Sequence, residues 1–283
     1  MKATPLIDAT TLADHFLEPG WVVLDVRCDL MDPASGRRAY EAGHIPGAAF
    51  ADVDHDLSGA KTGTNGRHPL PERAALVERF RDWGIGPATQ IVAYDAHGGQ
   101  FAARLWWLAR WLGHDQVAVL DGGWPAWLAA KGGASQEAPD RLRGDFAASA
   151  PLEAVVTADE VLATLGDRRH LIIDARAAER FEGKVEPIDP VAGHIPGAAN
   201  RFWSLNLTES GRFKPADQLR EEFTALLDGH ALADVIHQCG SGVSACHNQL
   251  ALAVAGLTGT RLYAGSWSEW AADPARPVAT GPR

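Results

Sequence analysis

The chain alternates short apolar runs with longer stretches of helical periodicity. Apolar runs begin at Trp21, Ile91, Leu171 and Val235, and each is only a few residues long. Short runs without regular polar alternation are typical of strands that are buried on both faces of a sheet. After one of them, apolar residues recur at helical spacing over 101–112. The pattern therefore predicts an α/β fold in which parallel sheets carry helices on both faces.

Much of this pattern occurs twice. An apolar run ends in Asp-x-Arg at 25–27 and at 174–176, and Gly-His-Ile-Pro-Gly-Ala follows at 43–48 and 193–198. Two further pairs keep the same order, since 91–95 matches 235–239 and 121–127 matches 264–270. These matches predict a duplicated domain. Because Asp-x-Arg occurs in both copies, we expect Asp174 and Arg176 to brace a sheet rather than to contact a substrate.

A segment rich in proline and glycine separates the two copies. It contains Gly132-Gly133, Pro139 and Pro151 among polar residues, which is typical of a linker. We predict a first domain over 1–135, a linker over 136–153 and a second domain over 154–283. Near the start of the second domain, Thr157 and Glu160 have the spacing of a capping box and predict the beginning of a helix.

One cysteine stands at the end of an apolar run. Cys239 is followed by Gly240 and Gly242, and then by an alanine- and leucine-rich stretch from Ala245 to about 257. This order predicts a strand, a tight turn and a helix. Glycines let the backbone N–H groups of the turn converge on one atom, and the helix N-terminus adds partial positive charge there. Such a loop favours the thiolate, which is the nucleophilic form of cysteine.

Cys239 has an alternative interpretation as a small apolar side chain that only fills space at a strand end. A cysteine of that kind requires neither the glycines nor the helix that follow it. The repeat adds a second argument, because the position that matches Cys239 in the first copy is Asp95. We therefore predict that the second domain carries the chemistry and that the first domain lacks the nucleophile.

Composition narrows the classes of partner and compartment. The chain is 46% hydrophobic and 22% charged, and its 26 basic and 36 acidic residues give a net charge of −10 without a basic cluster. Nucleic acid and anionic membranes are therefore poor partners. The cysteines are Cys28, Cys239 and Cys246, an odd number that argues against a disulfide framework. With no apolar signal segment at the N-terminus, we expect a cytoplasmic protein.

The repeated phrases resemble those of the rhodanese superfamily in its tandem-domain form, the thiosulfate and 3-mercaptopyruvate sulfurtransferases. The resemblance extends from Leu24 to Trp270 and implies two rhodanese-like domains, with Asp95 marking the inactive one. It also implies an active loop over 239–244. Thiosulfate enzymes resemble Cys-Arg-Lys-Gly-Val-Thr there, and mercaptopyruvate enzymes resemble Cys-Gly-Ser-Gly-Val-Thr. This chain has Cys-Gly-Ser-Gly-Val-Ser, which is closer to the second pattern.

The resemblance also implies roles for individual residues. It makes Cys239 the nucleophile, Ser241 and His68 a proton relay with Asp54 behind them, and Arg180 the ligand of the donor carboxylate. The persulfide would be held by backbone amides of the loop, from Gly240, Gly242, Val243 and Ser244. The chain departs from the family pattern in three ways. The loop over 59–66 is longer, the second substrate-binding arginine is missing where Glu186-Pro-Ile-Asp189 stands, and Ala264 replaces an aspartate.

The activity implied is sulfur transfer from 3-mercaptopyruvate, through a persulfide on Cys239, to cyanide or to a thiol such as thioredoxin or a small thiol, with release of pyruvate. No cofactor and no metal are implied. Thiosulfate is the alternative donor, and a non-catalytic persulfide carrier is a further alternative. A cysteine phosphatase would need an arginine six residues after the cysteine, and that position is Ala245.

Overall fold

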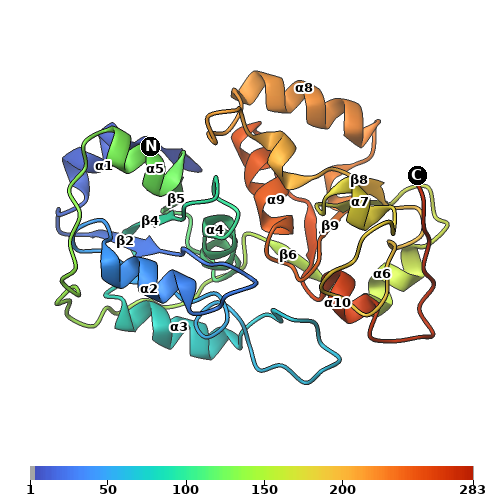
Figure 1. Ribbon diagram of the computed structural model, residues 1–283, viewed down its shortest axis with the longest axis horizontal. Coiled ribbons are helices and arrows are strands. Elements are labelled where there is room, and N and C mark those ends of the chain that lie inside the picture. The colour runs from blue at the N-terminus through green and yellow to red at the C-terminus, as the bar shows by residue number, and fades with distance from the viewer. Residues whose placement is uncertain (1–3, 283) are drawn as a thin grey trace. The chain divides into compact units, whose positions relative to one another are not determined.

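The computed structural model describes residues 4–282, which form two compact units. The first unit comprises the chain up to Gly59, Pro71–Leu152 and Leu207–Phe213. The second comprises Ala60–Leu70, Glu153–Asn206 and the chain from Lys214 onward. Each unit is an α/β domain built on its own five-stranded parallel sheet, as the pattern of apolar runs predicts (Figure 1).

The sheet of the first unit has the strand order β1-β5-β4-β2-β3. Its strands are β1 (Leu6–Ile7), β2 (Trp21–Asp25), β3 (Ala49–Phe50), β4 (Gln90–Tyr94) and β5 (Val117–Leu120). Its helices are α1 (Ala9–His15), α2 (Ser35–Ala42), α3 (Arg73–Asp82), α4 (Ala102–Trp111) and α5 (Gly123–Ala129). Residues of α1 and α5 pack on Val23, Val92 and Tyr94, so these two helices cover one face of the sheet.

The sheet of the second unit repeats this order as β6-β10-β9-β7-β8. Its strands are β6 (Ala154–Val156), β7 (Leu171–Asp174), β8 (Ala199–Asn200), β9 (Val235–Gln238) and β10 (Arg261–Tyr263). Its α-helices are α6 (Ala158–Thr164), α7 (Ala178–Phe181), α8 (Ala216–Leu227), α9 (Ala245–Val254) and α10 (Ser266–Trp270), and short 3-10 turns are η1 (Trp203–Asn206) and η2 (Leu232–Asp234). The shared strand order confirms the duplication, and it places β9 in the middle of its sheet, where β4 lies in the first.

Local sequence signals account for several element boundaries. The predicted capping box is present at the start of α6, where the Thr157 side chain accepts from the Glu160 backbone N–H and the Glu160 carboxylate accepts from the Thr157 backbone N–H. Helix α9 begins at Ala245 as expected but ends at Val254, a few residues before the expected end near 257. Gly256 follows with φ +75°, a left-handed conformation that glycine adopts without strain and that terminates a helix.

Two segments lie differently from what composition suggests. Residues 136–152 belong to the compact first unit, where Phe146 is buried and the Arg141 guanidinium donates to the carbonyls of Trp21 and Gly47. Residues 60–70 belong to the second unit, although the chain on either side of them belongs to the first. The domain boundaries at 135 and 153 therefore stay predictions.

Among residues 4–282, no helix has the length and apolar character that crossing a membrane requires.

The Asp-x-Arg phrase forms the same ion pair in both units. Arg176 Nη2 lies 2.7 Å from Asp174 Oδ2, also donates to the Gly193 carbonyl at 2.7 Å, and its guanidinium lies 4.8 Å from the centre of the Trp267 ring. In the first unit, Arg27 contacts Asp25, the Gly43 carbonyl and Trp124 in the corresponding way. The paired residues join the carboxyl end of a central strand to the Gly-His-Ile-Pro-Gly-Ala segment, which is the bracing geometry expected for them.

Candidate active site

Cys239 directly follows strand β9 and begins a tight loop at the carboxyl ends of the strands of the second sheet. Cys239 is 1% exposed, and its Sγ accepts from the backbone N–H of Gly242 at 3.1 Å. Gly242 has φ +79°, and a Cβ at this position would lie 2.2 Å from the carbonyl oxygen of Ala264. Only glycine fits this close approach. Ala264, where an aspartate was expected, therefore contacts the loop through its backbone.

The corresponding loop of the first unit holds a carboxylate. Asp95 is fully buried, and its two oxygens accept from four backbone N–H groups at 2.8–2.9 Å, those of His97, Gly99, Phe101 and Ala102. A loop at this place in the fold thus directs a set of amides onto a single side-chain anion. Cys239 occupies the same place in the second unit, between a central strand and the N-terminus of a helix, so the site is suited to a thiolate or a persulfide.

Ser266 supports the loop, a role that no motif in the sequence predicted. Its hydroxyl accepts from the backbone N–H of Cys239 at 3.1 Å and donates to the Tyr263 carbonyl at 2.9 Å. Its φ is +54°, an unusual value for a residue other than glycine. The matching residue in the first unit is Gly123, with φ +55°. Ser266 therefore keeps a strained backbone conformation and adds a hydroxyl that positions Cys239, and the glycine in the matched segment was the available signal.

Ser241 and His68 come together as the resemblance implied. His68 Nδ1 lies 2.7 Å from Ser241 Oγ, and the two residues are 5% and 3% exposed. His68 reaches this position because the segment over 60–70 packs with the second unit. Asp54 lies in a turn of the first unit, where its backbone N–H donates to Asp52. The role of Asp54 behind His68 stays a prediction.

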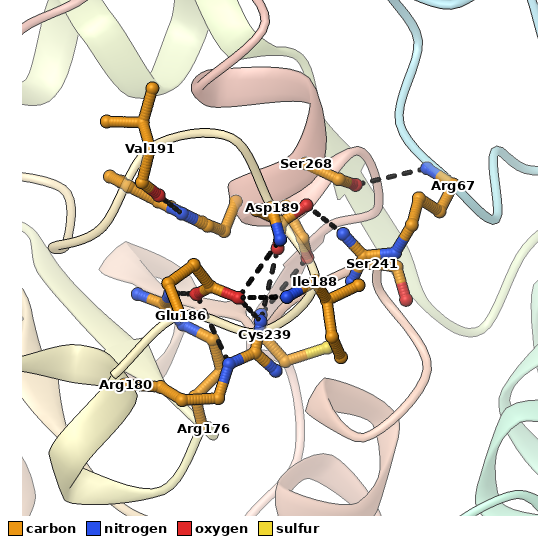
Figure 2. Close-up of polar contacts among 12 residues, drawn as sticks. Arg67, Arg176, Arg180, Glu186, Ile188, Asp189, Val191, Cys239, Ser241 and Ser268 are labelled. Atoms are coloured by element: carbon orange, nitrogen blue, oxygen red, sulfur yellow. Dashed lines mark hydrogen bonds and ion pairs between the residues drawn. The ribbon is translucent and has the colours of Figure 1, made fainter. Parts of the chain in front are cut away.

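Arg180 lies beside the loop and is held by acidic side chains. Its guanidinium pairs with Glu186 at 2.6 Å and with Asp189 at 3.1 Å (Figure 2). Two of its nitrogens, Nη1 and Nη2, are 3.5 Å and 3.7 Å from the point where a Cβ on Gly240 would lie. The side chain is 19% exposed, so it is fixed in orientation and still accessible. This geometry suits a guanidinium that binds a small carboxylate next to Cys239.

The other two cysteines are placed for packing. Cys246 is fully buried in α9, and its thiol donates to the Gly242 carbonyl at 3.3 Å. Cys28 is 9% exposed, and burial, with nearby aspartates such as Asp54, raises the pKa of its thiol to about 12. A thiol of that pKa is protonated and unreactive at neutral pH. Across residues 4–282, no three His, Cys, Asp or Glu side chains are grouped as metal ligands would be.

Comparison with known proteins identifies this architecture. The rhodanese-like domain family matches residues 8–130 and 157–273, and each match includes most of one of the two sheets. The chain belongs to the rhodanese-like family. A relative from Pseudomonas aeruginosa, provisionally named a 3-mercaptopyruvate sulfurtransferase, is 49% identical over 99% of this chain and 100% of its own length. A Mycobacterium tuberculosis relative, provisionally named a thiosulfate sulfurtransferase, is 40% identical over 92% of this chain and 90% of its own.

A solved structure agrees with this placement in the rhodanese-like family. The 3-mercaptopyruvate sulfurtransferase SseA from Escherichia coli superposes with a TM-score of 0.79 at 32% identity, covering 94% of this chain and 99% of SseA. The tandem rhodanese-like architecture expected from the repeat is confirmed, and the chain is a sulfurtransferase. Some relatives are named for 3-mercaptopyruvate and others for thiosulfate, so the donor has to be inferred from the site.

Proposed function

We propose that this sulfurtransferase takes sulfur from 3-mercaptopyruvate and passes it to a thiol acceptor, such as thioredoxin or a small thiol, or to cyanide. The observation that carries the proposal is the combination of Cys239 in an amide-lined loop with the Ser241–His68 contact of 2.7 Å beside it. The names of the Pseudomonas aeruginosa and Escherichia coli relatives support the same donor.

The reaction has two steps. In the first, the Cys239 thiolate attacks the sulfur of the donor, a sulfur–sulfur bond forms and the carbon–sulfur bond breaks. The electron pair stays on the donor carbon, which takes up a proton and leaves as pyruvate. In the second step, the acceptor thiolate or cyanide attacks the outer sulfur of the persulfide and restores the Cys239 thiolate. Backbone amides of Gly240, Gly242, Val243 and Ser244 stabilise the sulfur anion in both steps.

Ser241 and His68 carry out the proton transfer of the first step. The thiol of mercaptopyruvate must lose a proton, and the carbon that leaves must gain one. A hydroxyl hydrogen-bonded to an imidazole can carry that proton between the two atoms. Arg180 holds the donor carboxylate, because its guanidinium faces Gly240, the residue after the nucleophile.

Replacing His68 with Gln tests the proton relay. Glutamine can hydrogen-bond to Ser241 but does not exchange a proton near neutral pH, so we expect kcat with mercaptopyruvate to fall by about 100-fold. Thiosulfate carries no proton on its transferable sulfur, so its kcat should change little. Steady-state assays with both donors and cyanide make the comparison, with Ser241→Ala as a second variant. Equal losses with both donors would contradict a proton relay and indicate a structural role for His68.

Steady-state assays of the unaltered enzyme test the donor itself. We expect a much higher kcat/KM with mercaptopyruvate than with thiosulfate, and release of pyruvate over many turnovers. A clear preference for thiosulfate would support the second candidate function, thiosulfate sulfurtransferase, which the name of the Mycobacterium tuberculosis relative favours. Release of a single equivalent of pyruvate per chain, even with excess acceptor, would indicate a persulfide carrier instead.

A further inference from the structure

The segment over 186–189 lacks the second arginine that the family pattern has for binding the donor. A second substrate-binding arginine was expected there, and the segment reads Glu186-Pro-Ile-Asp189 instead. Both acidic side chains point to Arg180, and they are only 3% and 4% exposed (Figure 2). With Arg180 alone, one guanidinium that is already paired with two carboxylates would have to bind the donor anion. A second cation close to Arg180 would make such binding more favourable.

Arg67 supplies a guanidinium at this place from a distant part of the chain. Its Nη1 pairs with Asp189 Oδ1, while Arg180 pairs with the other oxygen of the same carboxylate, Asp189 Oδ2. Asp189 thus holds the two guanidiniums side by side, each on one of its oxygens (Figure 2). Without the shared carboxylate, two neighbouring cations would repel each other.

The second amino group of Arg67 is directed at the catalytic loop. Its Nη2 is 2.9 Å from the point where a Cβ on Gly240 would lie, and Arg180 Nη1 is 3.5 Å from the same point. The two guanidiniums therefore meet above Gly240, immediately next to Cys239. Any side chain at position 240 would fill this space, so the glycine keeps it open for an anion.

The backbone around Arg67 is fixed in place. The Arg67 N–H donates to Ser268 Oγ at 3.0 Å, and Ser268 belongs to α10 of the same unit. The preceding residue, Gly66, has φ +84°, and a Cβ there would lie 2.7 Å from the Gly265 carbonyl oxygen. The close contact with Gly265 brings Arg67 to the loop with little freedom to move. Its side chain is still 28% exposed, so a small ligand can reach it.

We infer that Arg67 is a substrate-binding residue that takes the place of the missing second arginine and, with Arg180, forms a two-guanidinium site for the donor carboxylate. The inference rests on the proposed function for the identity of the donor. Two planar guanidiniums that converge on one point can each donate to a carboxylate oxygen, and such charge-assisted bonds are among the strongest that proteins make.

Kinetics of Arg67→Ala with mercaptopyruvate test this assignment. We expect KM to rise by about 10- to 100-fold, the loss typical of one hydrogen bond to a charged group, while kcat changes by less than about threefold. Arg67→Lys should recover only part of the loss, because lysine lacks the planar fork. The control is Arg169→Ala, since Arg169 is 80% exposed and pairs with Asp167, which is not a residue of this site.

A second variant keeps the test valid if Arg67→Ala proves unstable. Introducing Ile188→Arg into the Arg67→Ala protein places a guanidinium on the segment where the family pattern has one, and KM should return toward the original value. Calorimetric titration of the Cys239→Ser protein with pyruvate, with and without Arg67→Ala, measures binding of the α-keto acid without turnover. We expect the affinity for pyruvate to fall by a similar factor when Arg67 is removed.

The outcomes separate this inference from the proposed function. An unchanged KM in Arg67→Ala, in a parent enzyme that does use mercaptopyruvate, would overturn the role of Arg67 and leave the function intact. An equal rise in KM for mercaptopyruvate and thiosulfate would overturn the assignment to the carboxylate, because it would indicate general attraction of anions. If the parent enzyme does not use mercaptopyruvate, the proposed function itself fails, and pyruvate binding alone decides the role of Arg67.

Discussion

Turnover is expected to disappear when Cys239 is replaced by Ser. A serine hydroxyl at this position is protonated at neutral pH and is a far weaker sulfur nucleophile than a thiolate. Removing the nucleophile of a covalent mechanism typically costs on the order of a millionfold in kcat. In the unaltered protein, treatment with donor alone should add the mass of one sulfur, about 32 mass units, as a persulfide. Cys239→Ser should not acquire this mass in intact-protein mass spectrometry.

The other cysteines provide matched controls for this experiment. Cys28→Ser and Cys246→Ser should keep most of the turnover and the added mass. Burial raises the pKa of Cys28 to about 12, and the buried thiol of Cys246, in α9, donates to the Gly242 carbonyl. Loss of turnover in Cys246→Ser as complete as in Cys239→Ser, in a protein that still folds, would contradict a mechanism with a single reactive cysteine.

The second large effect is expected on stability, from Asp174→Ala. Asp174 and Arg176 are almost completely buried, with side chains 0% and 1% exposed. Removal of Asp174 takes away the closest counter-charge of a buried guanidinium, and breaking a buried ion pair typically costs about 3–5 kcal/mol. Arg176 would keep the Gly193 carbonyl and a longer ion pair with Glu186 at 3.4 Å, but Glu186 also pairs with Arg180, so it replaces only part of the lost interaction. We therefore expect the second unit to lose about this much free energy of unfolding.

Hydrogen exchange measured by mass spectrometry can locate the loss. In Asp174→Ala, amides of β7 and β9 should lose protection, while those of β2 and β4 should change little, because each unit has its own sheet and its own core. The matched control is Asp25→Ala in the first unit, where the same ion pair exists and the pattern should reverse. A loss below about 1 kcal/mol, the usual range of exposed pairs, would contradict the bracing role.

The amino-acid sequence by itself determined the architecture, and it predicted Cys239 as the nucleophile. The short apolar runs, the capping box of α6 and the order strand–glycine turn–helix at Cys239 are local patterns, and each determines the backbone conformation within a few residues. The repeat added information that one domain alone would lack, because the contrast between Asp95 and Cys239 supports the prediction that the second unit carries the chemistry. The same comparison marked Asp174 and Arg176 as bracing residues.

The tertiary structure decided which side chains surround the nucleophile. Arg67 contacts residues 122 and 201 positions away in the sequence, and His68 contacts Ser241, which is 173 positions away. No local pattern encodes such contacts, since they depend on the packing of a loop whose flanking residues belong to the other unit. The left-handed conformation of Ser266 could not be predicted from the sequence either, because a serine adopts it only when surrounding contacts outweigh the strain. Cys239 could thus be predicted as the nucleophile from the sequence, whereas the position of the Arg67 guanidinium near it is known only from the fold.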